Sequence, residues 1–318
     1  MEAAGCRRDG EAGQATVEWI GLLLLVAVLL AALLVAGLRV PVSSLARSIA
    51  ARIVCAVSLS DICAEEPELV AAYGAELAGL LRAHSPGLAY ERGMHALPVD
   101  FRSCRSSACG DGAGEGVVWR TDAGQPVVAF VHVVDCRAAA ATATEHAGED
   151  CSGERSGNLY LQYWTYYADS ATLRGVPVAG SHGYHHDDWE GVQFRIGPDG
   201  RVDQRASSHH GYNCEQGAAN WGSDAGIGVL ERAAERLGAR PAGGWCEASN
   251  WLFVSGGSHA GNVRSDFRRI SRVTPRRRVR LIPLEPIAAG EEGPPPAFAV
   301  SAPWLKQVWR DPEAEGTS

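Results

Sequence analysis

The chain has 318 residues, of which 46% are hydrophobic, so it is long enough for one domain of ordinary size with additional segments and is not a disordered tail. Its formal net charge is −8 at pH 7, so the protein as a whole should repel a polyanion, which argues against general nucleic-acid binding. Arginine supplies nearly all the basic residues and Lys306 is the single lysine, a composition that we attribute to codon bias and not to recognition chemistry.

A long uncharged segment lies near the N-terminus. Residues 19–38, WIGLLLLVAVLLAALLVAGL, carry no charge. At about 1.5 Å per residue, a helix of this length crosses a hydrocarbon core of roughly 30 Å. No small-residue cleavage site follows, so the segment is not typical of a secretory signal peptide. We predict a transmembrane helix over residues 14–38; a buried core helix is the alternative.

The cysteines indicate on which side of the membrane the rest of the chain lies. Cys6 precedes the apolar segment, whereas the other eight cysteines follow it. An even number on one side is typical of disulfides in an oxidising exterior. We therefore predict a single-pass protein of the cell membrane with a cytoplasmic N-terminus and an extracytoplasmic C-terminal domain. The expected pairs are Cys55 with Cys63, Cys104 with Cys109, Cys136 with Cys151, and Cys214 with Cys246. A zinc cluster is the competing interpretation, although no CxxC motif occurs.

The residues just before the apolar segment resemble a processing signal. GQATVEWIG, residues 13–21, is similar to the leader of type IV-like prepilins of the tight-adherence class. In that class the peptidase cuts after a glycine, and the fifth mature residue is a glutamate, which would be Glu18 if cleavage follows Gly13. The resemblance implies a cytoplasmic leader over residues 1–13 and a prepilin peptidase as partner. An uncleaved anchor is the alternative.

The chain changes character near residue 110. Residues 39–110 contain Ala- and Leu-rich stretches with helical apolar spacing, which predict a helical spacer. Residues 111–290 instead predict short strands separated by Gly and Pro turns, with one helix at 226–238. This pattern is typical of a mainly β domain, a β-sandwich or jelly-roll-like fold. Residues 291–318 look solvated, and we expect a flexible C-terminal tail. The expected strands are 117–121, 126–134, 159–167, 191–196, 201–207, 250–257 and 277–287.

The segment HGYHHDDWEG, residues 182–191, concentrates histidines and carboxylates around one tryptophan. A strand through residues 188–196 puts Asp188 and Glu190 on the face of the apolar side chains that follow them. Trp189 then lies on the opposite face and packs the sheet. Ionised carboxylates on a core face are costly unless they are paired or bound to a cation. A divalent ion held by oxygens and one histidine would satisfy them; an exposed rim with solvated histidines is the alternative.

The same segment resembles known families. HHDDWEGV looks like the GHRHDWE heptapeptide of the necrosis- and ethylene-inducing peptide-like cytolysins, and it also resembles the DWE segment of the vacuolar protein-sorting 62-like family. Further pieces recur in the same order. QYWTYYAD at 162–169 and SSHHGY at 207–212 resemble cytolysin segments, and SGGSHA at 255–260 is similar to the vacuolar family.

The resemblance implies a β-sandwich with a metal pocket at one end. Carried over by motif, the metal ligands are Asp169, His185, Asp188 and Glu190. Carboxylate oxygens outnumber nitrogen in this set, which favours calcium, magnesium or manganese over zinc. Tyr184 and His186 stand where the heptapeptide has a glycine and an arginine. Strand alternation favours His186 beside Asp188, whereas the motif favours His185, which we prefer. Because the secreted cytolysins lack a membrane anchor, host-cell killing is not implied.

Three more histidines and an arginine-rich run lie downstream. We expect His209, His210 and His259, together with His186, to support the metal ligands or to contact a bound molecule; histidines that cap strand ends are the alternative. Residues 264–280 contain eight arginines. They suit contact with phosphate head groups or anionic envelope polymers, and they suit a solvated surface as well.

Three functions then compete for the extracytoplasmic domain. The first is metal-dependent binding of a glycan or a lipid head group, which we favour. The second is metal-assisted hydrolysis of an envelope substrate, in which the cation activates water. The third is a structural role in a pilus-like assembly. No Gly-x-Ser-x-Gly, P-loop or His-Glu-x-x-His motif occurs, so the sequence supports binding more than catalysis.

Overall fold

The computed structural model divides the chain into two compact units, Met1–Ala50 and Ala51–Ser318, and all the described residues belong to the second. They are residues 66–92, 96–102, 126–137, 150–171, 184–208, 211–213, 245–263, 270–286, 298 and 300–314. Several predicted features lie outside the described residues. These are the leader, the transmembrane segment, the helix at 226–238, the pairs Cys55–Cys63 and Cys104–Cys109, and the side chains of His209 and His210.

One α-helix is described, α4 (Pro67–His84), and it follows the apolar spacing noted in the sequence. Leu69 and Leu81 are fully buried on its inner face. Pro67 stands in the first turn, where its missing N–H has no helical partner to lose. Gly74 adopts a φ of 78° and kinks the helix, which a side chain would oppose. Among the described residues, no helix is both long enough and apolar enough to cross a membrane.

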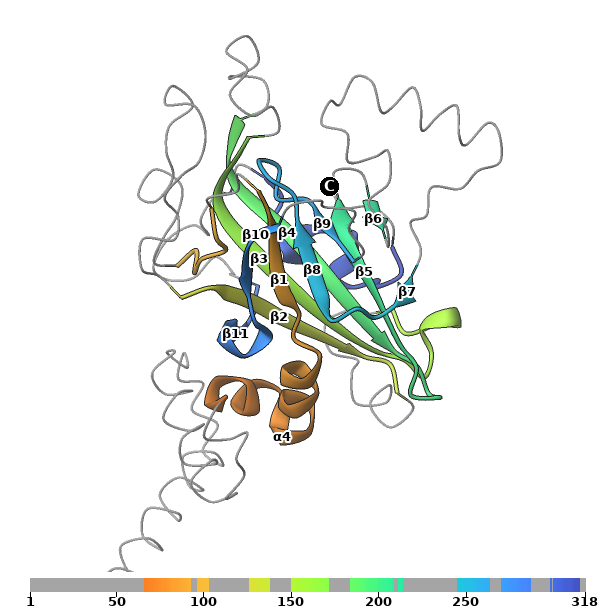
Figure 1. Ribbon diagram of the computed structural model, residues 1–318. Coiled ribbons are helices and arrows are strands. Elements are labelled where there is room, and N and C mark those ends of the chain that lie inside the picture. Colours follow the sequence, from red (N-terminus) through yellow and green to blue (C-terminus); the bar gives the residue numbers. More distant parts are fainter. Residues whose placement is uncertain are drawn as a thin grey trace, which may run out of the picture. The chain divides into compact units, whose positions relative to one another are not determined.

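The strands form two sheets (Figure 1). They are β1 (Gly87–Glu91), β2 (Val128–Asp135), β3 (Leu159–Ala171), β4 (Tyr184–Ile196), β5 (Val202–Ser208), β6 (Gly211–Asn213), β7 (Cys246–Glu247), β8 (Trp251–Val254), β9 (Gly261–Asn262), β10 (Ile270–Thr274) and β11 (Arg280–Pro283). The smaller sheet has the order β10-β1-β8-β9, and the larger has the order β11-β2-β3-β4-β5-β6 with β7 beside β5. The predicted mainly β fold is confirmed for the described part of the chain.

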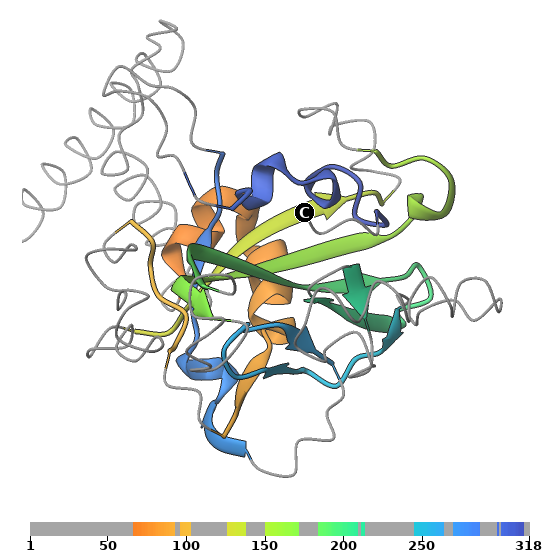
Figure 2. The ribbon, with the colours of Figure 1, turned by 90° about the horizontal axis from the view of Figure 1, so that it is seen from above.

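The central ladder of the larger sheet joins β3 and β4, each 13 residues long. Its register runs from Leu159 opposite Ile196 to Ala171 opposite Tyr184. Both views show the two strands side by side (Figures 1 and 2). A turn at residues 197–200 then leads into β5, as the sequence GPDG predicts. The long β3–β4 hairpin carries the carboxylates of the candidate site.

The core lies between the two sheets. Leu88 of β1 and Leu252 of β8 belong to the same buried cluster as Tyr163 of β3 and Val192 of β4. The sheets therefore pack face to face as a sandwich, with α4 adding its apolar face to this cluster. Because alternate strand residues point to opposite faces, Trp164 and its neighbours form a second cluster on the other side of the larger sheet.

Two boundaries expected from the sequence need correction. β1 lies inside the region assigned to the helical spacer, yet it pairs in parallel with β8 and antiparallel with β10. The sandwich thus begins before residue 110; a strand of five residues is too short to show its own periodicity. The expectation of a flexible tail is also wrong for residues 300–314. Val308 and Trp309 are buried there against the second cluster.

The 3-10 helices are short connections, and three of them matter for the sites below. η5 (Arg276–Arg278) links β10 to β11, whereas η6 (Pro303–Leu305) and η7 (Gln307–Trp309) lie in the folded C-terminal segment. The predicted disulfide between Cys136 and Cys151 is confirmed. Cys246 is also disulfide-bonded; its pairing with Cys214 stays a prediction because Cys214 lies outside the described residues.

Candidate functional site

The β3–β4 ladder sets the geometry of the predicted carboxylate site. Across it, Thr165 lies opposite Glu190, Tyr167 opposite Asp188, and Asp169 opposite His186. Directly opposed residues of an antiparallel pair share a face, and so do alternate residues along one strand. The register thus confirms that Asp188 and Glu190 share one face of the sheet.

Trp189 lies on the opposite face, also as predicted. It belongs to the second cluster, whereas Val192 and Phe194, further along the face of Glu190, belong to the core between the sheets. Its ring centroid lies 5.1 Å from that of Tyr166 and 5.3 Å from that of Phe101. The indole therefore packs the sheet from behind and takes no part in the carboxylate site.

Three carboxylates of this region are withdrawn from water. Asp169 is 0% exposed, Asp188 is 7% exposed and Glu190 is 9% exposed. Moving an ionised carboxylate out of water costs several kcal/mol unless other groups compensate its charge. The neighbours of each carboxylate therefore decide what this end of the hairpin can bind.

The nearest compensating group for Asp188 is His259, which lies in the SGGSHA segment between β8 and β9. Its Nδ1 is 2.8 Å from Oδ2 of Asp188, and the side chain is buried. The imidazole stacks on the ring of Tyr167, with centroids 3.9 Å apart and planes 14° apart. His259 thus contacts a predicted metal ligand that is 71 positions away in the chain. Its role in supporting a metal site stays a prediction.

Glu190 is held by a serine of β5. The Ser207 hydroxyl donates to Oε2 of Glu190 over 2.6 Å and accepts from the backbone N–H of Gly191 over 2.5 Å. The β4–β5 ladder reaches Val192 opposite Ala206, so this hydroxyl satisfies the backbone where the ladder stops. Burial, and then the negative charge of Asp188, raises the pKa of Glu190 well above its usual range.

A cation comes from the C-terminal segment. Lys306 stands between η6 and η7, and burial lowers its pKa, while the charges of Glu190 and Asp188 act in the opposite sense. The two carboxylates and the ammonium therefore act on one another electrostatically. The sequence offered one signal for this role, since Lys306 is the single lysine, and the attribution to codon bias overlooked it.

Two histidines stand at the start of β4, and the His185 side chain contacts the backbone. Nδ1 of His185 lies 2.9 Å from the carbonyl oxygen of Asp187, so this nitrogen is the donor. His186 is exposed. Asp187 has a φ of 59°, which interrupts the regular alternation, and its Oδ1 accepts from the Tyr166 hydroxyl over 2.6 Å. Neither the role of Asp187 nor that of Ser207 was predicted.

The donor set fits a metal ion in part. Asp188 and Glu190 lie together, and Asp169 is the diagonal neighbour of Asp188, a relation that places Cα atoms about 7–8 Å apart. Three carboxylates suit the oxygen preference of calcium or magnesium. In the described part of the chain, however, no three His, Cys, Asp or Glu side chains already converge as a metal site. The ligand set of Asp169, His185, Asp188 and Glu190 stays a prediction.

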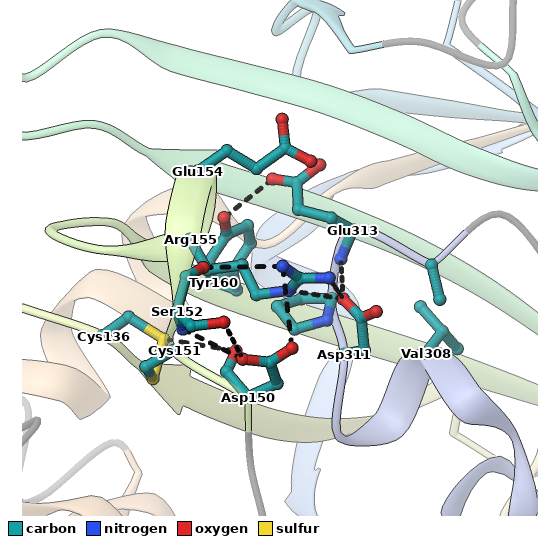
Figure 3. A network of polar contacts seen from close by, with 12 residues as sticks. Cys136, Asp150, Cys151, Ser152, Glu154, Arg155, Tyr160, Val308, Asp311 and Glu313 are labelled. Carbon is teal, nitrogen blue, oxygen red and sulfur yellow. Dashed lines mark hydrogen bonds and ion pairs between the residues drawn. A yellow bond between two sulfur atoms is a disulfide. The ribbon is translucent and has the colours of Figure 1, made fainter.

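The segment that carries Lys306 is anchored at its far end by a polar network (Figure 3). Glu313 accepts from the Tyr160 hydroxyl over 2.7 Å, from Arg195 over 3.1 Å and from Nε1 of Trp245 over 2.5 Å. The Arg155 guanidinium pairs with Asp311 at 2.6 Å. Figure 3 also shows the Cys136–Cys151 disulfide near Arg155. This covalent crosslink restrains the loop whose Arg155 binds the C-terminal segment through Asp311.

No protein-family model matches the chain, and no curated protein matches it either. Among solved structures it is similar to Necrosis and Ethylene inducing Protein 2 from the causal agent of cocoa's witches' broom disease, with 20% identity and a TM-score of 0.27 over 42% of this chain and 51% of that one. It is also similar to NLPPya in complex with mannosamine, with 21% identity and a TM-score of 0.27 over 43% and 52% of the two chains. The chain thus spans about half the length of these structures. The chemistry of the site has to come from its own residues.

Proposed function

We propose that the chain is a membrane-anchored extracytoplasmic protein whose sandwich domain binds a divalent cation and, through it, a glycan or a lipid head group. The observation that carries the proposal is the gathering of buried carboxyl groups at one end of the β3–β4 hairpin. Asp169, Asp188 and Glu190 are all buried there, and burial together with the charge of Asp188 raises the pKa of Glu190. A divalent cation would favour the ionised form of these groups and offset its charge.

The proposed ligands are Asp169, His185, Asp188 and Glu190, with calcium, magnesium or manganese as the ion. The His185 contact supports this set, because an Nδ1–H bound to a carbonyl leaves Nε2 as the ring nitrogen able to bind a metal. The His259 contact orients the carboxylate of Asp188 in the same way. A bound cation would supply a positive centre for sugar hydroxyls or a phosphate oxygen.

Binding is better supported than hydrolysis. The Ser207 hydroxyl, which is hydrogen-bonded to a site carboxylate, donates to Glu190 instead of to a histidine. A serine nucleophile needs a base within hydrogen-bond reach to accept its proton. A glutamate that serves as a metal ligand is a poor candidate for that base, so we assign Ser207 to positioning Glu190.

The anchor and the compartment are proposed from two features. Residues 19–38 carry no charge over a length that spans a bilayer. The disulfide between Cys136 and Cys151 suits an oxidising exterior, since disulfides rarely persist in the cytosol. Cleavage after Gly13 by a prepilin peptidase remains part of the proposal, and N-terminal sequencing of membrane-extracted protein decides it.

Calorimetric titration of the full-length chain in detergent with calcium, magnesium or manganese tests the site. We expect wild type to bind at least one of these ions and Asp188→Asn and Glu190→Gln each to weaken binding by about tenfold or more, because each removes a charged ligand. Lys306→Gln should act in the opposite sense and strengthen binding, because it removes a competing positive charge.

Asp135→Asn is the matched control. Asp135 is 8% exposed and pairs with Arg137, but it lies opposite Leu159 at the other end of β3. This variant should bind the ion as wild type does. The proposal is wrong if wild type binds none of the three ions, or if both site variants bind as tightly as wild type.

A further inference from the structure

A charged pocket lies where α4, η5 and β11 meet, formed by residues other than those of the carboxylate site. Its volume is about 400 Å³. Figure 1 shows α4 close to β11. The charged residues that line it are Glu66, Glu68, Arg82, Arg277, Arg278 and Arg280. Four guanidinium groups thus face two carboxylates, and the pocket carries an excess of positive charge.

The turn that presents the arginines is fixed in place. One Arg82 nitrogen donates to the carbonyl oxygens of Arg276 and Val279, both over 3.0 Å. In return, the Arg276 guanidinium donates to the carbonyl oxygen of Ala83 over 3.0 Å. These reciprocal bonds tie η5 to the last turn of α4. A ligand that binds here therefore does not have to order the backbone of the turn.

Two of the four arginines are paired with described residues, and the other two have no such partner. Arg82 forms an ion pair with Glu66, and Arg280 lies 3.3 Å from Glu68. The exposed side chains of Arg277 and Arg278 form no hydrogen bond or ion pair with any residue that the structure describes. Arg277 and Arg278 therefore supply the donors of the pocket. The Arg280–Glu68 ion pair lines the same pocket, and an incoming anion can displace Glu68 from it.

We infer that this pocket binds the phosphate group of an anionic ester, with Arg277 and Arg278 as its donors. Two neighbouring guanidinium groups match the oxygens of a phosphate, which they contact by paired charge-assisted hydrogen bonds. The arginines on this short turn are thus a built anion site instead of a uniformly solvated face.

The surface beside the pocket favours a lipid as the source of the phosphate. β10 leads directly into η5, and its Ile270 and Val273 are 44% and 51% exposed. Apolar side chains next to arginines are typical of surfaces that rest on anionic membranes. The lipid form of the inference rests on the proposed membrane attachment, whereas binding of a phosphate ester as such does not.

Calorimetry of the full-length chain in zwitterionic detergent, with glycerol 3-phosphate as probe, tests the site itself. We expect saturable binding by wild type and a loss of about tenfold or more in Arg277→Gln/Arg278→Gln, because two charge-assisted contacts disappear. Arg310→Gln, which removes an exposed arginine of the C-terminal segment, should bind as wild type does. Glu68→Gln should bind about two- to fivefold more tightly, since it releases Arg280 from its pair.

Chemical protection distinguishes the two sources. The full-length chain is placed in nanodiscs of phosphatidylcholine alone or with phosphatidylglycerol, and modification of Arg277 and Arg278 by phenylglyoxal is followed by mass spectrometry against Arg310. Protection only in the phosphatidylglycerol discs supports a lipid head group. Protection by glycerol 3-phosphate but not by these discs supports a soluble ester. The inference is overturned if neither protects the two arginines, or if the double variant binds the probe as tightly as wild type; neither result bears on the carboxylate site.

Discussion

Substitutions at Trp189 distinguish two contributions to the unfolding free energy. One is the stabilisation from packing of the indole ring, and the other is the cost of burying its N–H group without a partner. The side chain is 3% exposed, and five aromatic ring centroids lie between 5.1 and 6.4 Å from its own. Trp189→Ala should lower the unfolding free energy by about 3–5 kcal/mol, as large-to-small core changes do. Nε1 of Trp189, however, is buried without a hydrogen-bond partner in the part of the chain that the structure describes, and such a donor costs about 1–3 kcal/mol.

Trp189→Phe removes that donor together with part of the ring. Removing the unpartnered donor should stabilise the fold, but the lost burial of a few carbon atoms, about 1–3 kcal/mol, offsets this stabilisation. The unfolding free energy of this variant should therefore lie within about 1 kcal/mol of that of wild type. Trp245→Phe is the control, because Nε1 of Trp245 donates to Glu313 over 2.5 Å and the same change there breaks a real hydrogen bond. Guanidinium unfolding followed by far-UV circular dichroism measures all three variants. A cost for Trp189→Phe equal to that of Trp189→Ala would refute the reasoning.

Three other changes test the parts of the fold that surround the site. Cys136→Ser/Cys151→Ser should lower the unfolding free energy by about 3 kcal/mol, because the disulfide closes a short loop; an unchanged denaturation midpoint would contradict this. Glu313→Gln should cost about 1–3 kcal/mol, since three donors converge on this carboxylate, and Glu76→Gln, which removes an exposed partner of Arg137, should cost almost nothing in the same titration. Burial, and then Arg276, lowers the pKa of His84, so the unfolded chain takes up a proton at higher pH than the folded one. Wild type should therefore lose more stability than His84→Gln as the pH falls from about 7.5 to about 5; parallel curves for the two proteins would refute this.

The face on which the carboxylates lie could be predicted because it depends on local geometry. In a strand the side chains alternate, so the apolar residues after Glu190 fix the inner face, and with it the positions of Asp188 and Trp189. The β4–β5 hairpin was predicted for a similar reason, since Gly and Pro at its turn act within a few residues. Such signals need no knowledge of the rest of the chain.

The partners of the carboxylates could not be predicted in the same way. His259 is 71 residues from Asp188, and Ser207 reaches Glu190 where β5 has stopped pairing with β4. Lys306 lies on a segment whose composition resembles a solvated tail. The fold of this segment depends on its contacts with the second cluster. Strand periodicity also fails at Asp187, because one left-handed residue changes the direction of the side chains before it. Contacts of this kind follow from tertiary packing, on which local patterns carry no information.

Asp188 has two neighbours with an unusual backbone conformation, the preceding residue Asp187 and the hydrogen-bond partner His259, and this supports a functional role for the carboxylate. Non-glycine residues with positive φ are uncommon, and the described residues contain three of them, Asp187 at 59°, Asn250 at 60° and His259 at 57°. One of these precedes Asp188 in the chain, and another is its hydrogen-bond partner. Aspartate, asparagine and histidine tolerate the left-handed region better than most residues, but it still costs free energy that packing must offset. A sheet that only needed to close its core would gain from a regular strand here. The strain instead sets the direction of a buried carboxylate and of the imidazole that contacts it, as expected of a site built to hold a charged ligand.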